Sequence, residues 1–382
     1  MVLAFVLNGF QFASFVSRIP DVRGGLELDN GSFGLLLLTS AAGAVLALPS
    51  AGFLIHRASA GAVVRLGVLT AALGLFVAAV GAGPLGAVAV SAIGLFVYGI
   101  GTSIWDVAMN VEGAEVERRL GRAIMPRFHA SWSLGSIAGA GLGVPVAALH
   151  VPLPVHLGVL SLLAVVLLLT GTRSFLPAEE EKKAKASPGS AWLEPRVVAI
   201  GVMVLCFAVV EGSANDWLSL ALIDGYDVAH WVGVAGYALF VSAMTSGRVT
   251  GTVVLDRFGR APVLWTTAVA AAVGILLVVL GDHVVLVVLG IVIWGLGASL
   301  GFPVGMSAGA DDPARSAARV SVVSTIGYGA FLAGPPLLGW LGDRVGTLDA
   351  LLAVAVLMLP AAATVFAARP ARQELESGVR RP

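Results

Sequence analysis

The chain has 382 residues, of which 58% are hydrophobic and 12% are charged, and its net charge is zero. Soluble globular proteins carry about 25% charged residues, so this composition excludes an ordinary water-soluble domain and indicates a protein embedded in lipid. The zero net charge gives no electrostatic case for nucleic acid, and the single cysteine, Cys206, cannot form a disulfide within the chain.

Apolar windows of about 20 residues without strict alternation predict membrane-spanning helices and not barrel strands. Six are predicted before a polar stretch at 172–196, namely 2–19, 32–55, 62–81, 87–110, 130–149 and 155–171. Six more follow it, namely 197–222, 232–255, 261–281, 284–303, 320–341 and 348–368. The stretch 172–196 contains three glutamates followed by two lysines and predicts a cytoplasmic linker between two six-helix bundles, 1–171 and 197–368. A cytoplasmic tail is predicted at 369–382.

The distribution of arginine and lysine orients these predicted spans. Of the 23 cationic residues, 19 fall in the even-numbered loops, the linker and the C-terminal tail, whereas the opposite side holds Arg18, Arg23 and Arg344. The positive-inside rule then places both termini in the cytoplasm. The remaining cation, Arg248, lies inside a predicted span.

An internal repeat relates the two halves of the chain. Residues 98–104 and 294–300 share the pattern aromatic-Gly-aliphatic-Gly-small-Ser-aliphatic, at an offset of 196. Arg57 and Arg257, in the loops after the second and eighth spans, are 200 positions apart. Parallel six-helix repeats are typical of secondary transporters whose halves move around a site near the bilayer midplane.

The loop after the eighth span reads Asp-Arg-Phe-Gly-Arg over residues 256–260. It resembles the loop signature Gly-x-x-x-Asp-Arg-x-Gly-Arg of the major facilitator superfamily. The resemblance implies an all-α fold of twelve transmembrane helices in two pseudo-symmetric bundles. It also implies a gating role for Asp256, Arg257 and Arg260, with Arg57 as the first-half counterpart.

The sequence departs from that signature at two places. Thr252 replaces the glycine in the second half, and His56 replaces the acid in the first half. Residues 339–346 match the same pattern on the opposite side of the membrane, where we expect a structural role at most.

The fourth predicted span carries a polar stripe. Thr102, Asp106 and Asn110 are spaced by four residues and so share one helix face. The repeat aligns Asp106 with Phe302, so the charge occurs in one half only. The segment resembles the Glu-x-x-x-Asn element of the fucose–proton symporter branch, which implies that Asp106 binds a proton or a sugar. Alternatively, Asp106 pairs with a neighbouring helix.

The first span lacks the second acid of that branch and offers Asn8 and Gln11 as candidate substrate-binding residues, together with Asn110. The seventh span carries Glu211, Asn215 and Asp216. Burial favours the protonated form of a carboxyl group, so both acids are proton-coupling candidates, and Asn215 is a candidate ligand.

Arg248 either neutralises a buried acid, binds an anionic substrate or extends to the cytoplasmic face. His129 either relays protons or caps a helix. Trp132 either stacks on a sugar or drug or packs between helices, and Tyr328 either contacts a hydroxylated ligand or holds helices together.

The sequence contains no phosphate-binding loop, metal motif or nucleophile elbow, so we expect no cofactor, no metal and no enzymatic activity. It predicts a monomeric, proton-coupled symporter of a bacterial cytoplasmic membrane that moves a small sugar-like solute by alternating access. The alternative is a proton-driven efflux antiporter for drugs or amphiphilic metabolites. A membrane receptor without transport activity is a third hypothesis.

Overall fold

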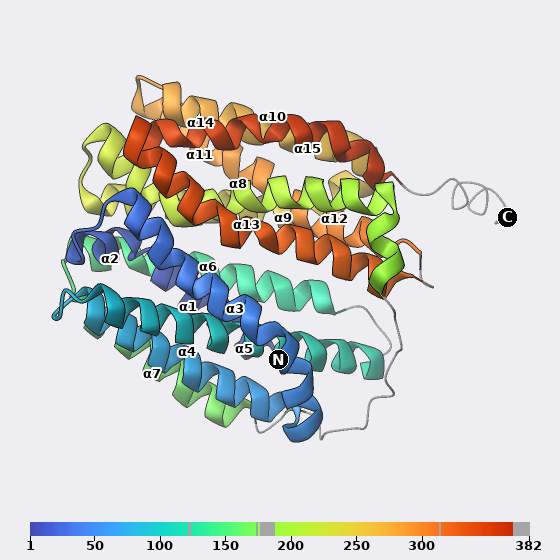
Figure 1. Cartoon of the computed structure of the whole chain (residues 1–382), viewed down its shortest axis with the longest axis horizontal. Helices are drawn as coiled ribbons and strands as arrows, with labels where there is room; N and C mark the ends of the chain where they lie inside the picture. Colours follow the sequence, from blue (N-terminus) through green and yellow to red (C-terminus); the bar gives the residue numbers. More distant parts are fainter. Residues whose placement is uncertain (121–123, 173–174, 176–187, 313–314, 370–382) are drawn as a thin grey trace, which may run out of the picture. The chain divides into compact units, whose positions relative to one another are not determined.

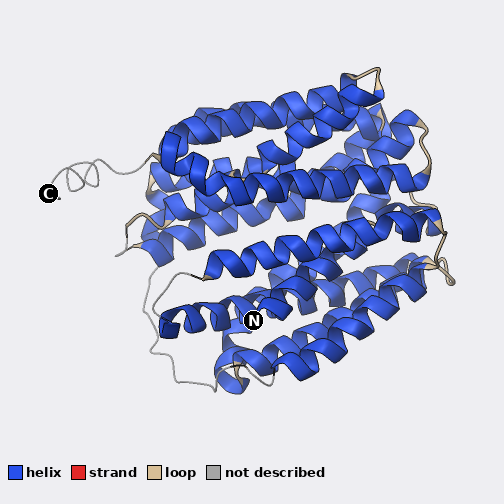
Figure 2. Ribbon diagram, turned by 180° about the vertical axis from the view of Figure 1, so that it is seen from behind, coloured by secondary structure: helices blue, strands red, loops and turns tan. Residues whose placement is uncertain are grey.

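The structure is a computed structural model that describes residues 1–120, 124–172, 175, 188–312 and 315–369. The described part of the chain is built from helices joined by loops, without β-strands (Figures 1 and 2). The all-α fold class expected from the sequence is therefore confirmed. Most of the predicted linker and the predicted tail beyond residue 369 lie outside the described residues.

The helices of the first half are α1 (Val2–Val16), α2 (Ile19–Gly25), α3 (Asn30–Ala58), α4 (Ala60–Ala82), α5 (Val88–Leu120), α6 (Met125–Ala148) and α7 (Leu153–Gly171). After the 3₁₀ helix η2 (Pro188–Leu193) come α8 (Pro195–Tyr226), α9 (His230–Phe258), α10 (Arg260–Leu280), α11 (Val284–Ala298), α12 (Gly301–Gly309), α13 (Ser316–Val345), α14 (Thr347–Val356), α15 (Met358–Thr364) and the 3₁₀ helix η3 (Val365–Ala368).

Each of the twelve predicted spans coincides with one helix or with two or three consecutive helical segments. In the described residues, ten spans are long and apolar enough to cross a membrane, and the pair α1–α2, bent by 42°, makes eleven. Helix α6 is outside this set although it has 24 residues. Its three serines and four glycines after residue 130 make it less apolar than its neighbours, and the apolar windows of the sequence still predict it.

Single residues with positive φ make the sharp turns between α3 and α4 and between α9 and α10. Gly259 of the loop signature has φ 76°, a conformation that glycine adopts without steric cost. The equivalent residue in the first half, 200 positions earlier, is Ser59 with φ 104°, and its side chain accepts a 3.3 Å hydrogen bond from the amide of Ala62. The same turn is therefore strained in one half and relaxed in the other.

This difference predicts opposite effects of exchanging the two residues. Ser59→Gly should raise the free energy of unfolding by about 1 kcal/mol. The relief of backbone strain exceeds the few tenths of a kcal/mol lost with the hydrogen bond from Ala62 to the Ser59 side chain. Gly259→Ser should lower the stability by a similar amount. Thermal unfolding of both variants in detergent checks this, and a lower unfolding temperature for Ser59→Gly would contradict it.

The described helices form two compact units. Unit 1 comprises Met1–Lys182, Ala214–Val241 and Pro335–Asp349, so it joins the first six spans to one end of α8, α9, α13 and α14. Unit 2 comprises Lys183–Ser213, Ser242–Gly334 and Ala350–Pro382.

Within unit 1, α4 and α5 approach closely through glycine. A Cβ atom added at Gly74 would collide with the backbone of Tyr98, and one added at Gly101 would collide with that of Ala71. Glycine lets two helix backbones come this close, which contributes dispersion contacts where lipid supplies no hydrophobic driving force.

Within unit 2, α10 and α11 pack in the same way. A Cβ atom at Gly274 would collide with the backbone of Trp294, and one at Gly297 with that of Ala271. The positions correspond to those of α4 and α5 at offsets of 200 and 196. The repeat found in the sequence is thus also a repeat of helix packing.

Candidate functional site

Two polar residues of α1, Asn8 and Gln11, are buried and hydrogen-bonded to neighbouring helices in unit 1. Trp132 Nε1 donates a 2.8 Å hydrogen bond to Asn8 Oδ1, and Gln11 Nε2 donates a 3.1 Å bond to Ser161 Oγ. Asn8 Nδ2 is buried and has no hydrogen-bond partner within the described chain. Phe12 lies against Trp132, with ring centroids 5.9 Å apart. The structure therefore brings together two of the predicted substrate-binding residues, Asn8 and Trp132.

Helix α5 positions Asp106 as the nineteenth of its 33 residues. The carboxylate is exposed, and Asn110 Nδ2 donates to Asp106 Oδ1 at 3.3 Å and to its main-chain oxygen at 2.9 Å. Four large apolar residues of this helix are exposed: Val88 and Leu120 are its first and last residues, and Ile93 and Val111, 63% and 37% exposed, lie between them. At 3.6 residues per turn, Ile93 and Val111 each lie about 140° around the helix from Asp106. Away from the helix ends, Asp106 therefore lies on a different face of α5 from the exposed large apolar residues.

An ion pair joins the middles of α8 and α9 in unit 2. Arg248 Nη2 donates to both oxygens of Glu211, at 2.8 and 2.7 Å, and Arg248 Nε donates to the main-chain oxygen of Ser299 at 3.3 Å. The two side chains are 25% and 18% exposed. Of the three roles considered for Arg248, pairing with an acid matches this contact. The sequence alone did not identify Glu211 as that acid.

The other polar residues of α8 belong to unit 1. Asn215 and Asp216 are half-buried, and neither makes a hydrogen bond or ion pair with another described residue. The adjacent Trp217 is buried against Phe33 of α3 in an edge-to-face contact with ring centroids 5.9 Å apart. Asp216 is thus a half-buried acid in a span without a counter-charge from the described chain.

His129 is exposed near the start of α6, and the centroid of its ring lies 5.4 Å from that of Phe5 in an edge-to-face contact. Glu117 takes the capping role at this helix start, because its Oε2 accepts from the amides of Ile124 and Met125 at 2.6 and 2.7 Å. On α13, the half-exposed ring of Tyr328 lies 6.2 Å from that of Phe331.

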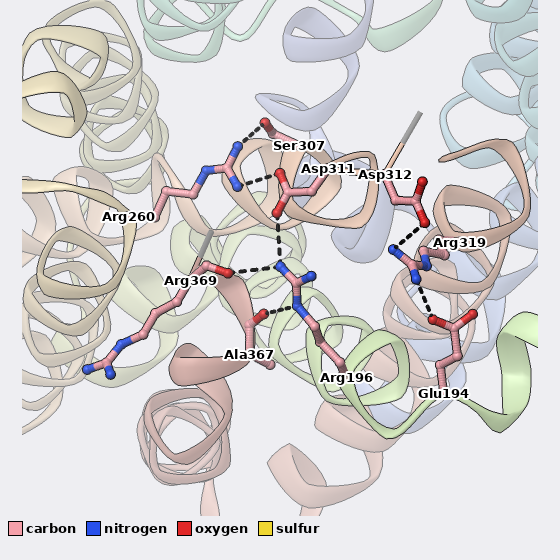
Figure 3. A network of polar contacts seen from close by, with 9 residues as sticks. All are labelled: Glu194, Arg196, Arg260, Ser307, Asp311, Asp312, Arg319, Ala367 and Arg369. Carbon is pink, nitrogen blue, oxygen red and sulfur yellow. Dashed lines mark hydrogen bonds and ion pairs between the residues drawn. The ribbon is translucent and has the colours of Figure 1, made fainter. Parts of the chain in front are cut away.

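The signature residues 256–260 contribute one arginine to a polar network in unit 2 (Figure 3). Arg260 Nη1 donates to Asp311 Oδ1 at 2.7 Å, and its Nη2 donates to Ser307 Oγ at 3.0 Å. Arg196 Nη2 donates to the other oxygen of Asp311 at 2.9 Å. Figure 3 shows Asp311 between the two guanidinium groups, and a second set in which Arg319 lies between Asp312 and Glu194.

The other predicted gating residues make no ion pair with described residues. Asp256 is exposed. The guanidinium group of Arg257 lies 5.3 Å from the ring centroid of Phe258, and that of Arg57 lies 4.6 Å from the ring centroid of Phe53, both within the range of cation–π contacts. The acidic partner of this region is Asp311, which the sequence did not reveal because it stands in a loop outside every predicted span.

Loss of Asp311 should destabilise unit 2. Its side chain is 8% exposed, so Asp311→Asn leaves Arg196 and Arg260 without their shared counter-charge and should cost about 2 kcal/mol of stability. Asp312→Asn is the matched control, since its carboxylate is 37% exposed and 3.4 Å from Arg319, and it should cost less than about 1 kcal/mol. Thermal unfolding in detergent compares the two, and equal losses would contradict the ranking.

Near the C-terminal end of α8, unit 1 carries a cluster that we name the Asp224 cluster, comprising Arg23, Asn30, Asp224, Asp343 and Thr347. Arg23 donates to both oxygens of Asp224 at 2.6 Å and to Asn30 Oδ1 at 2.8 Å. Thr347 Oγ1 also donates to Asp224, at 2.7 Å. The cluster therefore links the first-half helices α2 and α3 to α8 and α14 of the second half.

Asp343, in the second signature-like segment, extends this cluster. Its carboxylate accepts from the amides of Asn30 and Gly31, at 2.9 and 2.8 Å, at the start of α3. Next to them, Asp29 accepts from the amide of Ser32, a bond that lowers the pKa of the Asp29 carboxyl group. Two acids thus satisfy amides at one helix N-terminus, where the dipole favours negative charge.

A second cluster near this end surrounds Arg18, which is 1% exposed. Arg18 Nε donates to Asp21 at 2.7 Å, its Nη2 donates to the main-chain oxygen of Val151 at 2.8 Å, and its Nη1 lies 3.4 Å from His156 Nδ1. His230 Nε2 of α9 lies 3.5 Å from Asp21. The sequence signal for both clusters was the presence of Arg18 and Arg23 on a side with few cations.

Comparison with known proteins identifies the family. Residues 1–335 match the model of the Major Facilitator Superfamily. The chain is 32% identical to an uncharacterized MFS-type transporter of Yersinia pestis, over 96% of this chain and 94% of the relative. It is also 28% identical to the membrane protein MosC of Rhizobium meliloti, over 95% and 88% of the two chains.

Solved structures share the fold at low sequence identity. A single-residue mutant of the nucleoside transporter NupG superposes with a TM-score of 0.79 at 16% identity, over 96% of this chain and 98% of NupG. A D-xylose–proton symporter superposes with a TM-score of 0.73 at 14% identity, over 96% and 95% of the two chains. With twelve predicted spans, a repeated packing unit and a family match over most of its length, the chain belongs to the major facilitator superfamily and is a multi-pass membrane transporter.

Proposed function

We propose that the protein is a proton-coupled symporter for a small hydroxylated solute and that Asp106 carries the proton. The observation that carries this proposal is an exposed carboxylate halfway along α5, about 140° from Ile93 and Val111, the exposed large apolar residues away from the ends of that helix. A carboxylate facing lipid at this depth would cost about 2.5–3.5 kcal/mol, so Asp106 faces water. The carboxylate is hydrogen-bonded to the amide of Asn110 on the same helix. Because this partner is neutral, Asp106 is able to gain or lose a proton.

The polar residues of α1 and α6 support a sugar-like solute. Asn8 offers a buried amide without a full set of hydrogen bonds, beside the indole of Trp132. An amide donor next to an aromatic ring suits a solute that has hydroxyl groups and an apolar ring face. The similarity of residues 106–110 to the fucose–proton symporter branch, and the sugar and nucleoside transporters among the structural neighbours, point in the same direction.

The positive-inside rule supports an orientation in the cell membrane with both termini in the cytoplasm. In that orientation the Asp224 cluster lies on the outer side and the Asp311 network on the inner side. The bonds of Arg23 and Asp343 would then hold the outer ends of the two sequence halves together, and alternating access would require those bonds to break.

Reconstituted protein tests the proposal. Proteoliposomes with a pH-sensitive dye inside should acidify when a transported sugar, polyol or nucleoside is added outside, and radiolabelled uptake should follow an imposed proton gradient. Uptake that is indifferent to the gradient, or the absence of flux for every member of such a panel, would refute the proposal.

Efflux of cationic amphiphiles is a second candidate. It is favoured by Asp216, a half-buried acid in α8 for which the described chain provides no counter-charge. Such an acid could bind a lipophilic cation and a proton in turn. Overexpression should then raise resistance to lipophilic cations, and Asp216→Asn should abolish that resistance, whereas the symport hypothesis predicts no change in resistance.

A further inference from the structure

The ion pair of Glu211 and Arg248 lies near the middle of two helices. Glu211 is the seventeenth of 32 residues in α8, and Arg248 is the nineteenth of 29 in α9. The position 200 residues before Arg248, the offset that relates the two halves, is Leu48. The first half therefore builds the corresponding helix with an apolar residue there. Ionised groups at this depth are costly and mark functional positions in membrane proteins.

The guanidinium group of Arg248 is only partly satisfied. An arginine side chain has five N–H donors, of which Nη2 serves Glu211 and Nε serves the main-chain oxygen of Ser299. Nη1 makes no hydrogen bond with any described residue, and a quarter of the side chain is exposed. One nitrogen of the guanidinium group is thus open, and release of Glu211 would complete the Nη1–Nη2 edge that binds a carboxylate in a bidentate manner.

An exposed aromatic residue lies beside α8 next to the position of Glu211, within unit 2. Phe331 of α13 is 38% exposed, and its ring lies 3.9 Å from the position that a Cβ atom would take on Gly212, the neighbour of Glu211. An aromatic ring therefore lies against α8 at the residue that follows Glu211. An ion pair with an aromatic ring this close to its acid suits an organic anion with a carbon skeleton better than an inorganic ion.

We propose that Arg248 binds the carboxylate of the transported solute, in exchange for Glu211, and that the substrate is a small hydroxylated organic acid such as a sugar acid. This inference rests on the proposed symport function. The hydrogen bonds from Arg248 Nη2 to Glu211 break, and those from Arg248 to the substrate carboxylate form. Glu211, half-buried without its counter-charge, then takes a proton from water, which is a second proton besides the one proposed for Asp106. One anion and one proton bind together, so the charge of the site is unchanged.

Single neutral variants of the pair test the exchange because they have opposite expected effects. Glu211→Gln removes the competitor of the substrate for Arg248, so detergent-purified protein should bind gluconate or glucuronate about tenfold more tightly. Arg248→Gln removes the site and should weaken that binding at least tenfold. Arg344→Gln is a matched control, because that arginine is stacked on Trp340 outside the pair. The affinity for glucose, which lacks the carboxylate, should not show these opposite shifts.

Isothermal titration calorimetry at two pH values gives the deciding readout. Wild-type protein should take up about one proton per bound anion, and Glu211→Gln should take up none through this site.

Two results would overturn the inference. Weaker anion binding in both single variants would indicate a purely structural pair. Failure of gluconate and glucuronate to bind wild-type protein and Glu211→Gln would show that there is no anion site. Proton-coupled flux of neutral solutes with no anion binding would overturn the inference and leave the proposed symport intact. Anion binding without any flux would instead refute the symport.

Discussion

Asp106→Asn should abolish uphill uptake driven by a proton gradient while preserving exchange of substrate across the membrane. The substitution keeps the shape of the side chain and its contact with Asn110 but removes the group that gains and loses a proton. A coupled carrier must bind substrate with different affinity in its two protonation states, so a fixed neutral side chain leaves binding and removes coupling. We expect gradient-driven accumulation to fall at least tenfold, measured as radiolabelled uptake in proteoliposomes.

The matched control for this variant is Glu115→Gln on the same helix. Glu115 is bonded to Arg118 and Arg119 near the end of α5, so its loss should leave coupling unchanged. Exchange of labelled for unlabelled substrate separates loss of coupling from loss of folding. If Asp106→Asn still accumulates substrate against its gradient, Asp106 is not the proton carrier.

Asp224→Asn should make the end of unit 1 that holds the Asp224 cluster open more often. Asp224 receives two bonds from Arg23 and one from Thr347, and the side chains of Arg23 and Asp224 are 19% and 28% exposed. For a bidentate, partly exposed pair we expect a loss of about 1.4 kcal/mol, which corresponds to about a tenfold shift toward the open state.

Accessibility of a buried reporter measures this shift. Phe33 is fully buried against Trp217 of α8, so a Phe33→Cys reporter in a Cys206→Ala background should react slowly with a membrane-impermeant maleimide. Adding Asp224→Asn should speed the labelling about tenfold. Glu27→Gln is the charge-matched control, because Glu27 is exposed and outside the cluster. Equal labelling rates in the two variants would show that the cluster does not hold this end closed.

The sequence by itself determined the helices and the family. Apolar windows located every span, including the less apolar α6, because lipid leaves the backbone no alternative to intrahelical hydrogen bonds. The repeat at offsets of 196 and 200 also followed from sequence, since close helix packing requires glycine at fixed positions and therefore leaves a trace in the residues.

The candidate site was predictable only in part. The step of four residues placed Asp106 and Asn110 on one face, and the contact between them agrees with that spacing. The tertiary structure alone decided that Asn8 meets Trp132, that Arg248 meets Glu211, and that Asp311 of unit 2 and Asp224 of unit 1 are the acids that bind arginines. These partners lie on different helices, and the charge of a residue fixes its need for a partner but not which helix supplies it.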